Sequence, residues 1–260
     1  MIPTVHAIYF SPTRSTAKIV KAVASAISSK LEIHDLTNDL SSPISIAENA
    51  IAVVGVPCYS GRVPEVAMQR LATIKANGTP VILVCVYGNR AFEDTLLELN
   101  NICSENGFIT ISAGAFIAKH GIFPEVANTR PDKNDMEKAQ QLGQQSLQCW
   151  LTGAGKGKQI SLPGNYPYRE RGKMPFPFQI QVNNDCNDCG KCIDLCPVGA
   201  IDKNDSTKID PYLCIACARC IQVCRQHARS FGGETFAATS QGFAQKNSAR
   251  KEIELFFPEA

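Results

Sequence analysis

The stretch AIYFSPTRSTAKIV, residues 7–20, passes from an apolar run through a hydroxyl-rich loop into a helical pattern. Residues 5–10 have the length and composition of a buried strand. The apolar residues that follow recur at helical spacing, at Ala17, Val20, Ala24 and Ile27. A strand that leads through a short loop into a helix is the unit from which parallel sheets are built. This stretch therefore predicts that the chain begins with a strand–helix unit of an α/β domain.

The same alternation continues to about residue 151. Further apolar runs lie at residues 31–36, 50–57, 80–88 and 108–118, and helical patterns at 63–74, 91–107 and 131–151. We interpret the region as five strands, each followed by a helix. Because parallel neighbours need right-handed crossovers, this order predicts an α/β fold, a doubly wound five-stranded parallel sheet with helices on both faces.

The composition and charge of the chain argue against several classes of protein. The chain has 260 residues, 44% of them hydrophobic, and a net charge of +2, so it has no basic excess that would indicate nucleic-acid binding. No apolar run approaches the length of a membrane span. The first ten residues, MIPTVHAIYF, lack the cationic start and cleavage site of a signal peptide. We therefore expect a cytoplasmic protein, in which thiols stay reduced.

Twelve cysteines in such a chain indicate metal rather than disulfides. Eight lie in two runs, CNDCGKCIDLCP at residues 186–197 and CIACARCIQVC at 214–224, and each run has the spacing C-x2-C-x2-C-x3-C. Structural zinc sites take four ligands in two pairs, which this repeated spacing does not match. Three closely spaced thiolates suit one face of an iron–sulfur cube. Of the scattered cysteines, Cys85, Cys103 and Cys149 are interpreted as packing residues.

Residues 179–230 resemble the bacterial two-cluster ferredoxins, and CPVGAI after the first run matches their usual wording. In that family the fourth cysteine of each run binds the opposite cluster. The resemblance therefore implies a small α+β domain with two [4Fe–4S] clusters. Cluster site I takes Cys186, Cys189, Cys192 and Cys224, and cluster site II takes Cys214, Cys217, Cys220 and Cys196. The second run departs from the family at Arg225, where proline is expected, and we predict a raised potential for the cluster that Cys224 holds.

Two segments lie outside these domains. Residues 152–178 are rich in glycine, proline and basic residues, and we interpret them as a solvated linker. The alternative is that the linker wraps over an anionic surface. The tail, residues 231–260, ends in EIELFF, which is either a strand or a docking segment.

Ligands of doubly wound sheets bind beyond the carboxyl ends of the strands, where the strand order reverses. The loop SPTRST, residues 11–16, offers hydroxyls at a helix N-terminus and suits one phosphate monoester. It lacks the glycines of a P-loop or of G-x-G-x-x-G. Taken alone, it would be more simply a helix cap. The later loops PCYSGRVP (57–64) and YGNRAFED (87–94) add Tyr59 and Phe92, which could sandwich a flat ring.

With these three loops, the first 150 residues resemble a flavodoxin, and the whole chain is similar to the fused flavodoxin–ferredoxin proteins. The resemblance implies FMN, with its phosphate on the hydroxyl-rich loop, Tyr59 and Phe92 on the two flavin faces, and the loop at Tyr87 on the polar edge. The candidate FMN residues are Ser11, Thr13, Arg14, Ser15, Thr16, Pro57, Cys58, Tyr59, Ser60, Gly61, Tyr87, Gly88, Asn89 and Phe92. Arg14 stands where flavodoxins usually carry glycine, and we expect its side chain to point to solvent.

FMN beside two clusters can interconvert one-electron and two-electron chemistry. We therefore expect an electron carrier with transient redox protein partners. One alternative is a flavin-dependent reductase of a small substrate fed by the clusters, for which His120, Tyr59 and Arg90 are the candidate proton donors. The other is a cluster-only carrier on a scaffold without flavin.

Overall fold

The computed structural model of the chain describes residues 4–38, 43–153, 160–172 and 175–259. The linker lysines Lys156, Lys158 and Lys173 lie outside these ranges. The sheet contains β1 (Val5–Tyr9), β2 (Leu31–Asp35), β4 (Ile51–Pro57), β6 (Thr79–Tyr87), β7 (Phe108–Ile117) and β10 (Glu254–Phe256). Its helices are α1 (Ser15–Ser25), α2 (Glu65–Leu71), α3 (Thr95–Glu105) and α4 (Lys133–Thr152). We call residues 4–153 the sheet domain.

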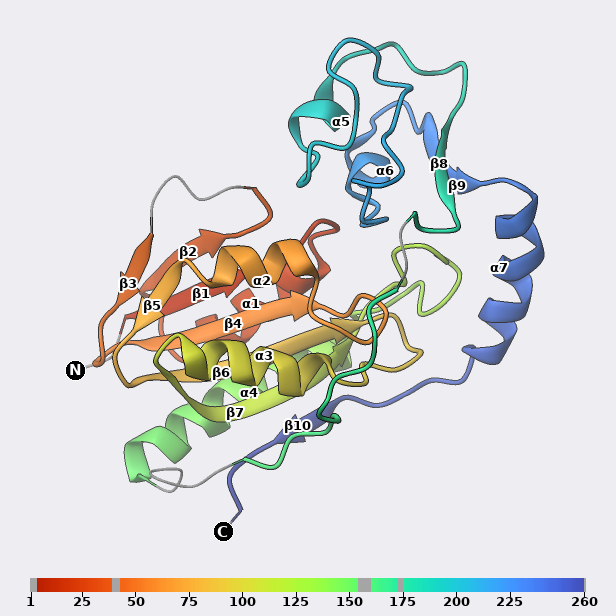
Figure 1. The fold of residues 1–260 in the computed structure, drawn as a ribbon. Coiled ribbons are helices and arrows are strands. Elements are labelled where there is room, and N and C mark those ends of the chain that lie inside the picture. Colours follow the sequence, from red (N-terminus) through yellow and green to blue (C-terminus); the bar gives the residue numbers. More distant parts are fainter. Residues whose placement is uncertain (1–3, 39–42, 154–159, 173–174, 260) are drawn as a thin grey trace.

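The strand order is β10-β7-β6-β4-β1-β2 (Figure 1). The five strands from the first half of the chain are parallel, and counted among themselves they follow the order 2-1-3-4-5 of flavodoxin-like folds. The predicted fold class is confirmed, with two differences. The described residues between β2 and β4 form no helix; they include the short β3 (Ile44–Ile46), which pairs with β5 (Ile74–Ala76). The tail adds β10, antiparallel to β7, as a sixth strand.

Two apolar layers hold the helices on the sheet. Helices α1 and α4 pack on one face around Val20, Val84 and Leu142, and α2 and α3 cover the other around Leu83 and Leu99 (Figure 1). All nine residues of β6 are buried, as expected for a central strand covered on both faces. The order reverses between β1 and β4, so the loops after these two strands meet at the carboxyl edge of the sheet. No helix in the described part of the chain is both long enough and apolar enough to cross a membrane.

The cysteine runs lie in a separate lobe, residues 179–232, which we call the cluster lobe (Figure 1). It contains the antiparallel pair β8 (Gln179–Val182) and β9 (Arg229–Gly232), with the short helices α5 (Lys191–Asp194) and α6 (Arg219–Val223). Helix α7 (Glu234–Lys246) then runs back towards the carboxyl-edge loops.

An aromatic cluster joins α7 to the loop after β7. The ring of Phe123 stacks on that of Phe243 with centroids 4.3 Å apart, and His120 meets Phe243 edge-on at 5.1 Å. His120 Nδ1 accepts hydrogen bonds from the N–H groups of Ile122 and Phe123, both at 3.1 Å, so its proton belongs on Nε2. Burial and the nearby Arg90 guanidinium lower the pKa of His120 to about 4. This imidazole is therefore neutral at pH 7, and its ring is not freely exposed to solvent.

The described part of the linker lies against the sheet domain, and the prediction of a solvated tether is wrong for it. Arg171 Nη2 donates to Glu98 Oε1 at 2.8 Å, beside Arg62, which holds both oxygens of the same carboxylate. Asp94 accepts the backbone N–H groups of Asn165 and Arg169. Glu98 and Asp94 are almost fully buried, so the linker adds a second cation to the Glu98 carboxylate and supplies the backbone donors that satisfy Asp94.

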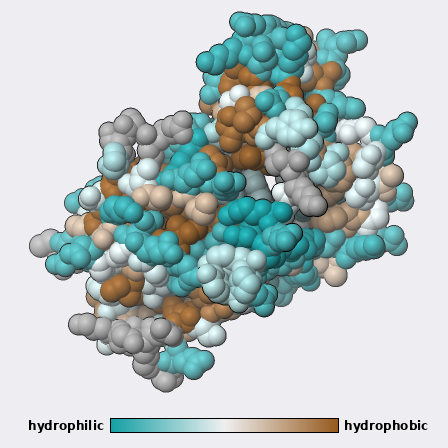
Figure 2. All heavy atoms as spheres, viewed as in Figure 1, coloured by the Kyte–Doolittle hydropathy of each residue, from teal (hydrophilic) through white to brown (hydrophobic). Residues whose placement is uncertain are grey.

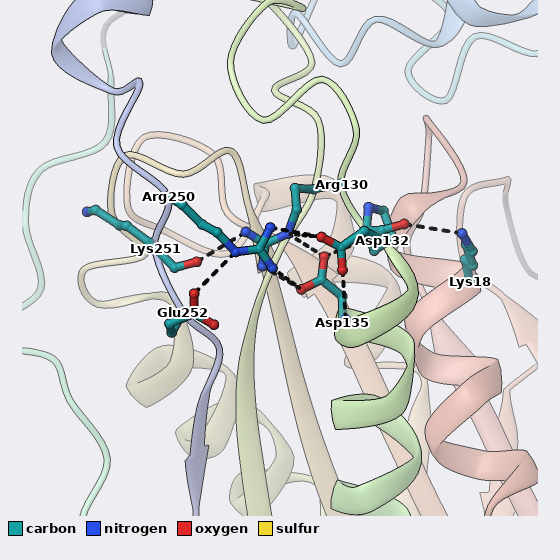
Figure 3. Close-up of polar contacts among 8 residues, drawn as sticks. Lys18, Arg130, Asp132, Asp135, Arg250, Lys251 and Glu252 are labelled. Carbon is teal, nitrogen blue, oxygen red and sulfur yellow. Dashed lines mark hydrogen bonds and ion pairs between the residues drawn. The ribbon is translucent and has the colours of Figure 1, made fainter.

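The tail is tied to the opposite side of the sheet domain (Figure 3). Asp132 caps α4, and its carboxylate accepts a 2.8 Å bond from Arg250 Nη1. The buried Arg130 forms an ion pair with Asp135 and donates to the Lys251 carbonyl at 3.1 Å. These bonds bring the chain back across the sheet domain just before β10.

Glu98→Gln removes the negative charge shared by Arg62 and Arg171 while keeping the side-chain size. Because two cations then lack their buried partner, we expect the free energy of unfolding to fall by roughly 3 kcal/mol. Thermal unfolding under anaerobic conditions measures this loss of stability. The rate of tryptic cleavage after Arg169 and Arg171 measures how far the linker is released from the sheet domain. Glu105→Gln, an exposed change on the same helix, is the control. Equal behaviour of the two variants would contradict our account of the linker.

Acidification should weaken the fold through His120. Its folded pKa of about 4 lies below the ordinary value of 6.5, so the unfolded chain binds more protons below pH 6.5 and stability falls with pH. Between pH 7.5 and 5.5, His120→Gln should lose about 1.4 kcal/mol less unfolding free energy than the unaltered protein. His227→Gln, at an exposed position, serves as the control. Identical pH dependence in all three proteins would refute the neutral buried imidazole.

Candidate functional site

Cluster site II gathers cysteines from both runs. Cys196 of the first run lines one small cavity together with Cys214, Cys217 and Cys220 of the second. The Ala200 N–H donates to Cys196 Sγ at 3.3 Å, which orients this thiol as a sulfur acceptor. This cavity therefore brings together the four cysteines that the ferredoxin resemblance assigns to one cluster.

Cluster site I is more open. Cys192 is buried, and Cys186 Sγ lies 3.6 Å from the hydroxyl of the buried Ser206. Cys189 is exposed and Cys224 is half-buried. The surface position of Cys189 makes this site the more accessible of the two.

The chemistry of the cluster lobe fits anionic iron–sulfur clusters. Burial raises the pKa of Cys217 far above its usual range and that of Cys220 to about 11, so these thiols stay protonated until a metal displaces the proton. Two buried arginine donors in this lobe, Arg219 Nε and Arg229 Nη1, have no hydrogen-bond partner within the described part of the chain. Unpartnered cationic donors beside cysteine sulfurs are suited to a cluster with negative charge.

A second cavity, of about 580 Å³, lies where the cluster lobe meets the carboxyl edge of the sheet. Its volume is in the range of small-molecule and cofactor sites. Figure 2 shows hydrophobic side chains gathered on the side of the cluster lobe that faces the sheet domain. Nine candidate FMN residues line the cavity: Thr13, Ser15, Thr16, Pro57, Cys58, Tyr59, Ser60, Tyr87 and Gly88. The cluster lobe contributes Tyr212, Ile215, Ala216 and Cys217 to the same walls.

The hydroxyl-bearing residues of the hydroxyl-rich loop have two different roles. Ser11 is buried and its Oγ accepts the N–H of Ala17 at 3.0 Å, so it satisfies a donor in the first turn of α1 and is not among the residues that line the cavity. The hydroxyls of Thr13, Ser15 and Thr16 form no hydrogen bond with any residue the structure describes, and they face the cavity at the helix N-terminus. These three residues are the ones that fit a phosphate monoester.

Arg14 lies on the outside of the loop. Its backbone is left-handed, with φ 68°, and its side chain is exposed. The left-handed conformation explains why glycine is common at this position in flavodoxins. Its side chain is not among the residues lining the cavity.

Tyr59 lines the cavity, but Phe92 does not, which corrects its expected place over the flavin. Phe92 is buried and packs on Tyr87 with ring centroids 5.3 Å apart. The aromatic rings that line the cavity besides Tyr59, Tyr87 and Tyr212 are His120, Phe123, Phe176 and Phe243. Most of these come from segments distant in sequence, so loop-by-loop reasoning could not find them.

Asn89 and Gly61 likewise do not line the 580 Å³ cavity. The Asn89 amide donates to the carbonyls of Asn247 and Ala249, both at 2.8 Å, and so holds the tail. Gly61, with φ 82°, shapes its loop and accepts the Asp94 N–H at 3.1 Å. Cys58 lines the cavity as a half-buried residue, and removal of its thiol from solvent raises its pKa.

Tyr59 lies next to cluster site II. Burial raises the pKa of Tyr59 well above its usual range, and the nearby Cys217 sulfur raises it further. Tyr59, Cys217 and Thr16 all line one cavity. The arrangement therefore brings a cluster ligand, an aromatic ring and a phosphate-binding helix start to one place.

Comparisons with known proteins agree with these two parts. Residues 167–238 match the family of 4Fe-4S dicluster domains. A curated relative, the iron-sulfur cluster-binding subunit of menaquinone reductase from Nitratidesulfovibrio vulgaris, is 37% identical over 71 residues, which are 25% of this chain and 28% of the relative. The chain thus spans just over a quarter of the length of that relative.

Solved structures similar to the chain include flavodoxin 1 from Bacillus cereus, at 14% identity and TM-score 0.41, covering 56% of this chain and 97% of that one. The Fusobacterium nucleatum flavodoxin bound to flavin mononucleotide is 15% identical with TM-score 0.40, covering 59% and 99%. The strand order of the sheet domain and the dicluster match of the cluster lobe together confirm the predicted arrangement. The chain joins a flavodoxin-like α/β domain to a 4Fe-4S dicluster domain.

Proposed function

We propose that the protein carries electrons between an FMN in the 580 Å³ cavity and two [4Fe–4S] clusters, and so links one-electron and two-electron redox partners. The observation that carries this proposal is the position of Cys217. It lines the cavity of cluster site II and also the larger cavity that holds the hydroxyl-rich loop and Tyr59. The relation to an iron-sulfur subunit of a reductase supports electron transfer in general.

Different residues that line the cavity would bind different parts of FMN. Thr13, Ser15 and Thr16 would hold the phosphate with hydroxyls and the positive end of α1. The aromatic and apolar side chains around Tyr59 would exclude water from a flat ring. Bound FMN would accept one or two electrons, while each cluster exchanges one. Cys217 would be the protein group between the two redox centres.

The protonation states favour a carrier over a reductase. The pKa of His120 is lowered to about 4, so at pH 7 it is not an imidazolium that could protonate a substrate. Burial raises the pKa of Tyr59, which makes its phenol a weak acid. The partners we propose are redox proteins that bind transiently, because electron-transfer interfaces are small.

Anaerobic purification followed by cofactor analysis tests the proposal. After reconstitution we expect about eight iron atoms and one FMN per chain from the ligand count. Reducing the clusters rapidly under anaerobic conditions should then bleach the flavin absorbance at a rate independent of protein concentration. A chain that binds iron but no FMN, or FMN that stays oxidised beside reduced clusters, would refute the proposal.

Thr16→Val keeps the side-chain shape and removes one hydroxyl from the proposed phosphate site. Since a hydrogen bond to a charged group contributes about 1.5–3 kcal/mol, FMN should bind about 10- to 100-fold more weakly. Fluorescence quenching of FMN on titration with the protein measures the dissociation constant. Thr152→Val, an exposed change at the far end of α4, should leave it unchanged. Unaltered affinity in Thr16→Val would place the phosphate elsewhere.

A further inference from the structure

Arg219 connects the two lobes at cluster site II. It stands between Ala218 and Cys220 in the second cysteine run, and its side chain is buried, with 8% of the residue exposed. Its Nη1 donates to the carbonyl of Pro12 at 3.0 Å, within the hydroxyl-rich loop that begins α1. A residue of the cluster lobe is therefore bonded directly to the proposed phosphate loop.

A second arginine makes the reciprocal contact. Arg70 of α2 donates from Nη2 to the carbonyl of Pro197 at 2.7 Å, and Pro197 directly follows the cluster ligand Cys196. The same guanidinium also binds the carbonyls of Leu36 and Thr37 through Nη1. One cationic side chain from each lobe thus fastens cluster site II to the sheet domain.

Another donor of Arg219 is buried without a partner. Its Nε–H forms no hydrogen bond with any residue that the structure describes, and Arg219 lines the small cavity formed by Cys196, Cys214, Cys217 and Cys220. Leaving a buried charged donor unsatisfied costs at least as much as an ordinary hydrogen bond. The acceptor that this cavity is built to hold is sulfur, from the cysteines or from the cluster itself.

We propose that Arg219 is a positioning residue that docks cluster site II on the flavin loop and raises the reduction potential of the cluster bound there. The proposal rests on the electron-carrier function proposed above. A buried cation stabilises the extra negative charge of a reduced cluster, and a hydrogen bond to its sulfur acts in the same direction. Electrons arriving at cluster site I would therefore pass to cluster site II, which adjoins the flavin cavity.

Arg225 offers a matched comparison. It follows Cys224 of cluster site I directly, but its side chain is exposed, so solvent screens its charge. Exposure weakens our earlier expectation that Arg225 raises the potential of the cluster bound there. Arg219→Gln and Arg225→Gln remove the same charge from the same lobe, one buried at site II and one exposed at site I.

Redox titration monitored by EPR, on protein without added FMN, measures the potential of each cluster. Arg219→Gln should shift the reduction equilibrium of one cluster by at least tenfold towards the oxidised form, which is 59 mV for a one-electron couple. The other cluster should move less than threefold. Arg225→Gln should move neither by more than threefold. Equal shifts of both clusters in Arg219→Gln, or a shift no larger than in Arg225→Gln, would overturn the proposal.

A second measurement does not depend on the folding of Arg219→Gln. In reduced protein labelled with ¹⁵N in the arginine guanidinium groups and carrying Arg229→Lys, pulsed EPR should detect ¹⁵N coupling to one cluster, and adding Arg219→Lys should remove it while keeping the charge. Absence of the coupling with Arg219 in place, or its persistence in the double variant, would contradict the Nε–sulfur bond. Both measurements proceed without FMN. Failure to bind FMN would therefore refute the proposed function and leave the assignment of Arg219 standing.

Discussion

The place of the cluster lobe depends on the chain being tied to the sheet domain both before and after it. Before the lobe, Arg171 of the linker binds the buried Glu98 carboxylate. After the lobe, the tail binds Asp132 and pairs with the edge of β7. Exposed ion pairs contribute little, but Glu98 is nearly inaccessible to water, and breaking its pairs is costly. The lobe is thus held by two anchors on opposite sides of the sheet.

Between these anchors, arginine side chains fix the contact itself. Arg219 and Arg70 each cross the interface to a backbone carbonyl, and both contacts lie next to cluster site II. For Arg219, a backbone carbonyl is a suitable partner because it leaves the cationic charge of this side chain uncancelled. That charge remains to act on the cluster, in a region where burial weakens screening by solvent. The Arg219 contact is therefore both a link between the lobes and an electrostatic element of the proposed electron path.

The loops of the candidate flavin site show which side-chain positions a residue pattern can predict and which it cannot. Thr13, Ser15 and Thr16 line the cavity as predicted from a loop at a helix start, whereas the hydroxyl of Ser11 from the same loop accepts the Ala17 N–H in the first turn of α1. Phe92 has the right residue type and loop but turns into the core. In both cases the outcome depended on neighbours several residues away, which composition does not specify.

By itself, the sequence determined the alternation of strands and helices, the doubly wound order and the two cysteine runs, because periodicity and ligand spacing are local properties of a chain. It also located the carboxyl-edge loops. Only the tertiary structure decided that Cys217 shares a cavity with Tyr59, that Asn89 binds the tail, and that the linker lies on Glu98. These facts bring together residues up to 160 positions apart in the sequence. Such pairings depend on how complete surfaces fit together, and no local pattern encodes them.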